Sequence, residues 1–351
     1  MKLFLIFSFL SFAVIGQEMD QLQRIESSLS ITLDSLRNAS SDSLKIELNK
    51  RLKYQVKECL NDKAAFSYPF NKLKSIGFVD SPDKLVRIVN WNIELSDQTQ
   101  KYVCFILKNS TKNDQIDVTE LIDSDQNCAA RPDGIIEPQN WYGALYYKII
   151  PIQKGTKTVY TLLGWDGNNS ISNIKIIESL FFTGKTPKLG SPIFKTPEGM
   201  LKRIIFEHTK KSTMSLRYEA ENKRIIFDHL SPEVPSLKGY YSFYAPDLSY
   251  DAFLLDGNRW LLKEDVIGLN KASDSKSTIY VMNQKSGKVE KRTVKTKWIN
   301  PSNEAPQKAT IEDGANNSKK EQVSPVLKSK DKRDPTDMKA TLGKRKRRNN
   351  H

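Results

Sequence analysis

Cysteine is scarce in this chain of 351 residues, which contains only Cys59, Cys104 and Cys128. Three cysteines exclude the class of small secreted proteins that are held together by disulfides. In an oxidising compartment they allow one disulfide and leave one thiol over. Because Cys104 lies in a strand-like run and Cys128 in a loop, we predict a disulfide between these two, with simply buried thiols as the alternative.

Histidine is equally rare, and the common catalytic motifs are missing. The three histidines are His208, His229 and His351. The sequence has no G-x-S-x-G elbow, no H-E-x-x-H zinc motif, no phosphate-binding glycine loop and no dinucleotide fingerprint. These absences disfavour histidine-based triads and nucleotide-dependent enzymes. A hydrolase that works with carboxylates alone stays open.

Long apolar runs are absent except at the N-terminus, where residues 1–16 have the pattern of a cleavable secretory signal. Lys2 provides the positive charge, an uncharged apolar run covers Leu3 to Ile15, and Gly16 provides a small residue before Gln17. The apolar run is shorter than the roughly 20 residues needed to cross a bilayer. The sequence therefore predicts an exported protein, periplasmic or secreted.

The positive charge is concentrated at the C-terminal end of the chain. The whole sequence carries a net charge of +14, of which residues 283–351 contribute 19 Lys/Arg and 8 Asp/Glu. Residues 299–351 contain few apolar side chains, and we expect them to form a disordered basic tail that ends in the basic run Lys344 to Arg348. Because the rest of the chain is nearly neutral, the positive net charge of the whole chain does not indicate a nucleic-acid-binding body. The predicted export also disfavours nucleic acid as a partner of the tail. Envelope polymers or an anionic membrane surface fit an exported basic tail better, and the alternative is a solvated tail that has no partner.

The remaining chain predicts a mainly β protein that is preceded by helices. Leucines at spacings of three and four indicate a helical hairpin over residues 17–62, followed by a linker over residues 63–82. About a dozen short strands with regular turn signals fill residues 83–298. The fold class is antiparallel meander sheets, arranged as a sandwich, a barrel or a propeller-like structure.

One short near-repeat stands out within the β-rich part. Arg203 to His208 reads RIIFEH, and Arg224 to His229 reads RIIFDH. Residues 214–220 between them alternate between apolar and polar side chains. The three segments predict a three-stranded meander in which each histidine and its neighbouring carboxylate point to opposite faces.

Several turns and strands resemble an uncharacterised family of exported proteins from Bacteroidota. The resemblance covers roughly residues 83–266, in the stretches Leu163 to Asn169, Ser191 to Phe194, Ser215 to Tyr218, Phe227 to Pro232 and Tyr244 to Asp247. It implies export from a Gram-negative cell. It carries no activity, so no residue receives a catalytic role from it.

Two groups of residues are candidate metal ligands. His208 and His229 would form a zinc site with a third ligand from elsewhere in the chain. Asp123, Asp125 and Asn127 place oxygen ligands at alternate positions, as calcium loops do. The second group lacks the glycine and the glutamate of a calcium-binding loop, so an ordinary polar loop is the alternative.

Tryptophans near turns are candidates for a ligand-binding platform. Trp91, Trp141, Trp165 and Trp260 each fall close to a predicted turn, where binding residues often collect. An aromatic platform of this kind suits cell-wall glycans. The alternative is that these side chains anchor the core.

These observations favour a non-catalytic binding or scaffold protein of the cell envelope. The alternative is a carboxylate-based hydrolase that acts on envelope glycans.

The basic tail generates a first prediction. In low salt, the full-length protein should sediment with anionic lipid vesicles, because each Lys or Arg near such a surface contributes about 1 kcal/mol. A version that ends at Asn300 should stay in the supernatant, and added salt should release the full-length protein by screening. Equal sedimentation of the two versions would contradict the predicted role of the tail.

Overall fold

The computed structural model describes residues 3–110, 115–124, 130–266, 276–282 and 289–295. The chain divides into two units, Met1–Asn270 and Lys271–His351. The second unit contains one described hairpin, in which β16 (Lys276–Met282) pairs antiparallel with β17 (Val289–Lys295). The predicted tail, residues 299–351, lies outside the described residues.

Two helices open the first unit, as the leucine spacing predicts. They are α1 (Leu3–Arg37) and α2 (Asp42–Leu60). The Ser41 hydroxyl caps α2 by accepting a hydrogen bond from the Leu44 N–H at 3.3 Å. Helix α1 continues without a break through the predicted cleavage position. No helix among the described residues is long and apolar enough to cross a membrane.

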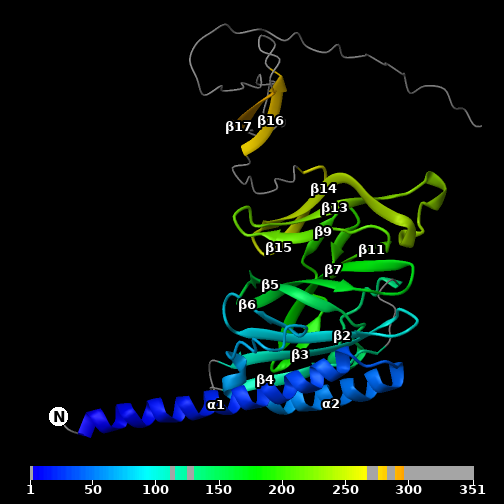
Figure 1. Cartoon of the computed structure of the whole chain (residues 1–351). Helices are drawn as coiled ribbons and strands as arrows, with labels where there is room; N and C mark the ends of the chain where they lie inside the picture. The colour runs from blue at the N-terminus through cyan, green and yellow to red at the C-terminus, as the bar shows by residue number, and fades with distance from the viewer. Residues whose placement is uncertain (1–2, 111–114, 125–129, 267–275, 283–288, 296–351) are drawn as a thin grey trace, which may run out of the picture. The chain divides into compact units, whose positions relative to one another are not determined.

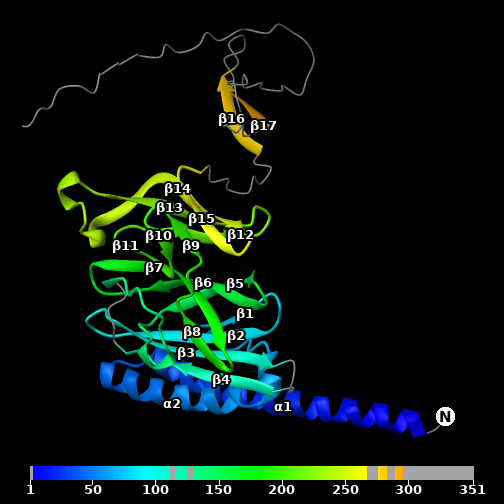
Figure 2. The same ribbon diagram turned by 180° about the vertical axis from the view of Figure 1, so that it is seen from behind.

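Three sheets lie in layers above the helices (Figures 1 and 2), so the protein is mainly β, as expected. The helix-side sheet has the order β1-β2-β3-β4, with β1 (Gly77–Asp80), β2 (Val86–Glu94), β3 (Gln100–Ser110) and β4 (Gln115–Leu121). The middle sheet has the order β11-β7-β6-β5 with β8 on β7, and comprises β5 (Leu145–Lys154), β6 (Lys157–Asp166), β7 (Ser172–Thr183), β8 (Thr186–Leu189) and β11 (Arg203–Thr209).

The outer sheet has the order β10-β9-β15-β14-β13-β12 and lies on the far side of the middle sheet (Figure 1). Its strands are β9 (Phe194–Thr196), β10 (Gly199–Leu201), β12 (Leu216–Glu219), β13 (Arg224–Pro232), β14 (Tyr244–Asp256) and β15 (Arg259–Lys263). Strands β9 and β15 run parallel, while the other strand pairs of the three sheets are antiparallel. The Gly257 turn joins β14 to β15, as its Asp-Gly-Asn sequence predicts.

The layers enclose three separate hydrophobic cores. One core lies between the helices and the helix-side sheet, the second between the helix-side and middle sheets, and the third between the middle and outer sheets. The helix-side and middle sheets are therefore buried on both faces. In β3, Cys104 and Ile106 enter the second core, while Val103, Phe105 and Leu107 enter the first. This explains why the inner strands read as continuous apolar runs.

Two groups of buried polar side chains between the layers form hydrogen bonds or ion pairs. Asn90 on β2 donates to the Gly77 and Tyr146 carbonyls and accepts from the Tyr146 N–H at 2.6 Å, so it joins the helix-side sheet to the middle sheet. Glu178 on β7 accepts from Arg203 Nε at 2.7 Å and from the Tyr142 hydroxyl at 2.8 Å. Both members of this ion pair are buried, so each charge depends on the other for compensation.

The predicted linker, residues 63–82, is folded: it contains a short 3₁₀ helix (Lys63–Phe66) and β1, and Tyr68, Phe70 and Leu73 are buried in the first core. The helical hairpin packs on the body, because its leucine stripe shares this core with β2 and β3. The predicted β-rich stretch, residues 83–298, extends over both units, since the first unit ends at Asn270 and the hairpin of β16 and β17 follows in the second.

Two predictions are wrong. The near-repeat does not form a meander, since β11 pairs with β7 in the middle sheet while β12 and β13 pair in the outer sheet. The predicted disulfide is not formed, because Cys104 is a free thiol buried in the second core. Burial raises the pKa of this thiol. Cys128 lies outside the described residues.

The buried ion pair generates a stability prediction. Replacing Glu178 by Leu leaves the Arg203 charge buried without compensation, and should lower the free energy of unfolding by about 3–5 kcal/mol. The exposed pair of Arg259 and Asp256 is the matched control, and Asp256→Asn should cost under about 1 kcal/mol. Urea unfolding of both variants measures the difference. A Glu178→Leu effect as small as the control effect would contradict this assignment.

Candidate functional site

The connection between β13 and β14 projects from the edge of the outer sheet, and we call residues 230–250 the arm (Figures 1 and 2). It contains the last residues of β13, two 3₁₀ turns (Pro235–Leu237 and Tyr241–Phe243) and the first residues of β14. The strand ends pair at its base, where Leu230 lies opposite Pro246 and Pro232 opposite Tyr244.

Large apolar side chains are exposed along the arm. They are Val234, Tyr240, Tyr241, Phe243 and Leu248, of which Leu248 is 93% exposed. Leu248 also has a φ of 75°, a left-handed conformation that a leucine seldom adopts. Contiguous exposed apolar groups mark binding surfaces more often than scattered ones do.

A groove lies between the arm and β11, the edge strand of the middle sheet. Its volume is about 180 Å³. Phe206, Phe227 and Leu230 form an apolar floor, and the Phe206 and Phe227 rings are tilted against each other at 41° with their centroids 4.7 Å apart. Tyr241 and Tyr244 contribute the wall on the side of the arm, with their ring centroids 5.1 Å apart.

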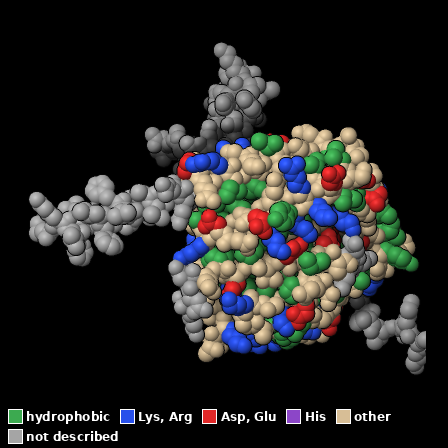
Figure 3. All heavy atoms as spheres, turned by 90° about the horizontal axis from the view of Figure 1, so that it is seen from below, with side chains coloured by type: hydrophobic (Ala, Val, Ile, Leu, Met, Phe, Trp, Pro, Cys, Tyr) green, Lys and Arg blue, Asp and Glu red, His purple; other side chains and the backbone are tan. Residues whose placement is uncertain are grey.

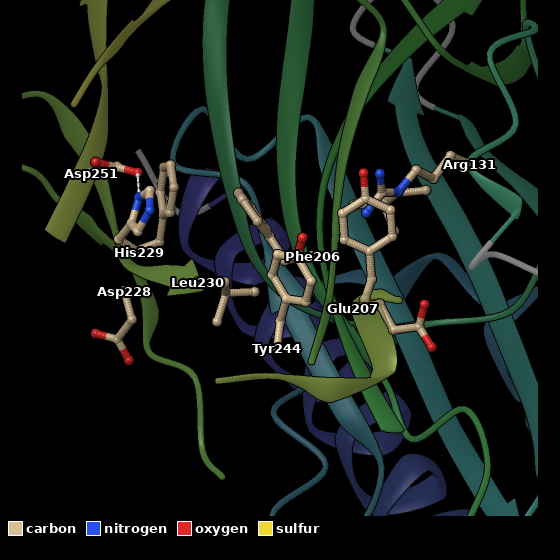
Figure 4. A pocket seen from close by; sticks show the side chains of 11 residues that line it. Arg131, Phe206, Glu207, Asp228, His229, Leu230, Tyr244 and Asp251 are labelled. Carbon is tan, nitrogen blue, oxygen red and sulfur yellow. Dashed lines mark hydrogen bonds and ion pairs between the residues drawn. The ribbon is translucent and has the colours of Figure 1, made fainter. Parts of the chain in front are cut away.

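Charged groups stand at the two ends of this groove. Figure 4 shows Arg131 and Glu207 at one end and His229 with Asp251 at the other, with Phe206 and Tyr244 between them. The Arg131 guanidinium lies 3.4 Å from the centroid of the Tyr241 ring, a cation–π contact. Arg131 has a φ of 55°, so the backbone that presents this side chain is strained.

His229 belongs to a cluster of carboxylates at its end of the groove. Its Nδ1 lies 2.7 Å from Asp251 Oδ2, and its Nε2 lies 3.9 Å from Asp247 Oδ2. The other carboxylate oxygen of Asp251 accepts from the Asp265 N–H at 3.1 Å. The hydrogen bond to Asp251 raises the pKa of His229, while partial burial opposes this shift.

The groove is better suited to binding than to covalent catalysis. Among its described lining residues there is no Ser, Thr or Cys that His229 would activate as a nucleophile. Its carboxylates have structural partners: Glu207 accepts from the Ser172 hydroxyl, and Asp228 from the Ser215 N–H. Small volume and an apolar floor fit one ring or chain end of a ligand, since pockets for drug-sized ligands measure about 300–1,000 Å³.

The structure does not confirm the predicted tryptophan platform. Trp91, Trp141 and Trp260 are fully buried, one in each of the three cores, and Trp165 is half-buried. Each buried indole N–H has a partner within its core, respectively Asn49 Oδ1, the Tyr146 hydroxyl and the Thr161 hydroxyl. These three side chains anchor the core and are inaccessible to a glycan.

The predicted zinc site is not assembled either. His208 is buried on β11, where its Nδ1 lies 3.0 Å from the Thr209 carbonyl and its Nε2 has no partner. Burial lowers the pKa of His208, whereas the pKa of His229 is raised. Within the part of the chain that the structure describes, no three His, Cys, Asp or Glu side chains are placed so that they could hold a metal ion together.

The predicted calcium loop is only partly described. Asp123 Oδ2 accepts from the Tyr102 N–H at 2.9 Å and thereby holds the loop against β3. Asp125 and Asn127 lie outside the described residues. Calcium binding at this loop therefore stays a prediction.

A second cleft of about 280 Å³ lies between α2 and the ends of β3 and β4. Its lysines include Lys53, which pairs with Glu120 at 2.8 Å, while Lys57 pairs with the same carboxylate at 3.6 Å. Figure 3 shows the face that carries the helices, where hydrophobic, basic and acidic side chains alternate rather than gather.

Sequence reasoning missed Arg131, Phe206, Tyr241 and Tyr244. A signal was present, because residues 240–244 contain four aromatic side chains between glycine and proline residues. Tyr241–Phe243 is a 3₁₀ turn that lies against β11. The turn explains why these aromatic side chains are accessible.

Comparisons with known proteins identify no relative of this chain. The chain matches no protein-family model, and no significant match links it to a curated protein or to a solved structure. The resemblance to exported Bacteroidota proteins therefore stays a prediction, and the chemistry of the groove is the basis for proposing a function.

Proposed function

We propose that this protein is a non-catalytic binding protein of the cell envelope, and that the groove beside the arm binds an envelope glycan. The observation that carries the proposal is the exposed tyrosine wall with charged groups at both ends. Export, which the N-terminal leader predicts, would bring the protein to such ligands.

The chemistry of a sugar ring supports this choice of ligand. One face of a pyranose ring consists of C–H groups, which pack against aromatic rings, while its edge carries hydroxyl groups. Tyr241 and Tyr244 offer the aromatic surface, and Glu207 and Arg131 offer an acceptor and donors for hydroxyl groups. A few polar groups beside an apolar surface are the usual means of orienting a ligand.

The alternative, a hydrolase acting on the same glycans, would require two carboxylates on opposite sides of a bound sugar, one of them free to transfer a proton. In the groove, Asp251 is held by His229 and by the Asp265 N–H, while Asp228 is held by the Ser215 N–H. These bonds favour a structural role for the acids.

Replacing Tyr241 by Ala tests the proposal. Binding of the full chain to insoluble peptidoglycan should weaken about tenfold, because an aromatic contact contributes roughly 0.5–1.5 kcal/mol beyond the area it buries. Tyr54→Ala is the matched control, since Tyr54 is a 66% exposed tyrosine on α2, away from the groove. Co-sedimentation over a range of protein concentrations gives both affinities.

Unchanged binding by the Tyr241→Ala variant, or equal weakening by the Tyr54→Ala variant, would contradict the proposed site. Time-dependent release of reducing ends from the peptidoglycan would instead support the hydrolase.

A further inference from the structure

His229 stands at the joint between the outer sheet and the arm. The register between β13 and β14 is regular up to Asp228, which lies opposite Tyr250, and resumes at Leu230, opposite Pro246. His229 therefore faces three residues of β14, 247–249, that have no register partner. Such an irregularity interrupts the ladder and the regular alternation of side chains. Here the side chain turns to Asp251, on the neighbouring strand β14. The contact lies where the arm leaves the sheet.

The surroundings of His229 are rich in negative charge. Asp247 and Asp251 face it from β14, and Asp265 acts on it from the segment after β15. On its own strand, Asp228 lines the same groove, while Glu207 and Arg131 stand at the far end. Among the described lining residues, the imidazolium of His229 is therefore the cation available to balance the near-end carboxylates.

We propose that His229 is a positioning residue of the groove: in its protonated form it fastens the base of the arm to the outer sheet, and its deprotonation loosens the arm. The tyrosine wall depends on this fastening, because Tyr241 and Tyr244 are part of the arm. The binding consequence rests on the proposed function, whereas the movement of the arm does not. The position of the tyrosine wall, and with it the shape of the groove, then depends on pH.

The direction of the effect follows from proton linkage. The fastened arm binds the proton of His229 more tightly than a released arm does, since the bond to Asp251 raises its pKa. The stabilisation is therefore complete below the ordinary histidine pKa of about 6.5 and is lost as the pH rises through the raised pKa. The neutral ring still donates a hydrogen bond to Asp251. Without its positive charge, the ring no longer offsets the repulsion among Asp247, Asp251 and Asp265.

The experiment is amide hydrogen exchange of the full chain without any glycan, between about pH 5 and 8, with the imidazole signals followed by NMR. Protection factors, which remove the intrinsic pH dependence of exchange, should fall severalfold in residues 230–250 as His229 titrates, because the fastened arm holds the proton of His229 more tightly than the released arm does. Amides of β2 and β3 serve as the internal reference and should not change.

Two variants complete the test. His229→Gln keeps a hydrogen-bonding side chain without a titrating charge, so the protection of its arm should be independent of pH. His351→Gln removes a histidine of the basic C-terminal segment and should behave like the wild type. If the His229→Gln arm responds to pH as the wild type does, or if the wild-type arm does not respond, the proposal is wrong.

The experiments distinguish the role of His229 from the proposed binding of a glycan. If the arm responds as expected but peptidoglycan does not bind, glycan binding fails and the role of His229 stands. If peptidoglycan binds through Tyr241 with the same affinity at both ends of the pH range, the role of His229 fails and glycan binding stands.

Discussion

The burial of both faces of the two inner sheets is the constraint on which the rest of the structure depends. Because successive side chains of β3 enter different cores, the strand cannot shift by one residue without exchanging its two packing surfaces. The same alternation joins the helices, the helix-side sheet and the middle sheet into one unit. Asn90 and the Glu178–Arg203 pair show how polar groups are accommodated between the layers, by hydrogen bonds and ion pairing.

This layered body also explains where a site can form. Both faces of the inner sheets are occupied, so accessible side chains gather at sheet edges and connections. The arm extends the outer sheet beyond its packed region and lies beside β11, the edge strand of the middle sheet. The groove is thus formed by two edges that the packing of the cores has left open.

The sequence predicted what depends on local spacing. The leucine stripe identified both helices, and the Asp256-Gly257-Asn258 turn identified the β14–β15 hairpin. Long-range pairing was not predictable from local pattern: β11 and β13 have nearly identical sequences but belong to different sheets, since their neighbours are decided by packing. The prediction of a tryptophan platform failed for a related reason, because a tryptophan near a turn can still be buried in a core, as Trp91, Trp141 and Trp260 are.

The residues of the groove likewise differ in how far local sequence could predict them. Its aromatic wall had a local signal in residues 240–244, whereas Arg131 and Phe206 come from distant parts of the chain and meet there only in the folded protein. The His229–Asp251 contact likewise lies at a register shift, where β14 has two more residues than β13, and alternation in the sequence does not reveal such a shift.

The central claim is that the groove beside the arm is the ligand-binding site. Mapping amide chemical shifts of the full chain while soluble peptidoglycan fragments are added tests it most directly. The account predicts that the shifts cluster on Arg131, Glu207, His229 and the segment Tyr241–Tyr244. Shifts confined to the cleft between α2 and β4, or no shifts at saturating fragment concentration, would contradict it.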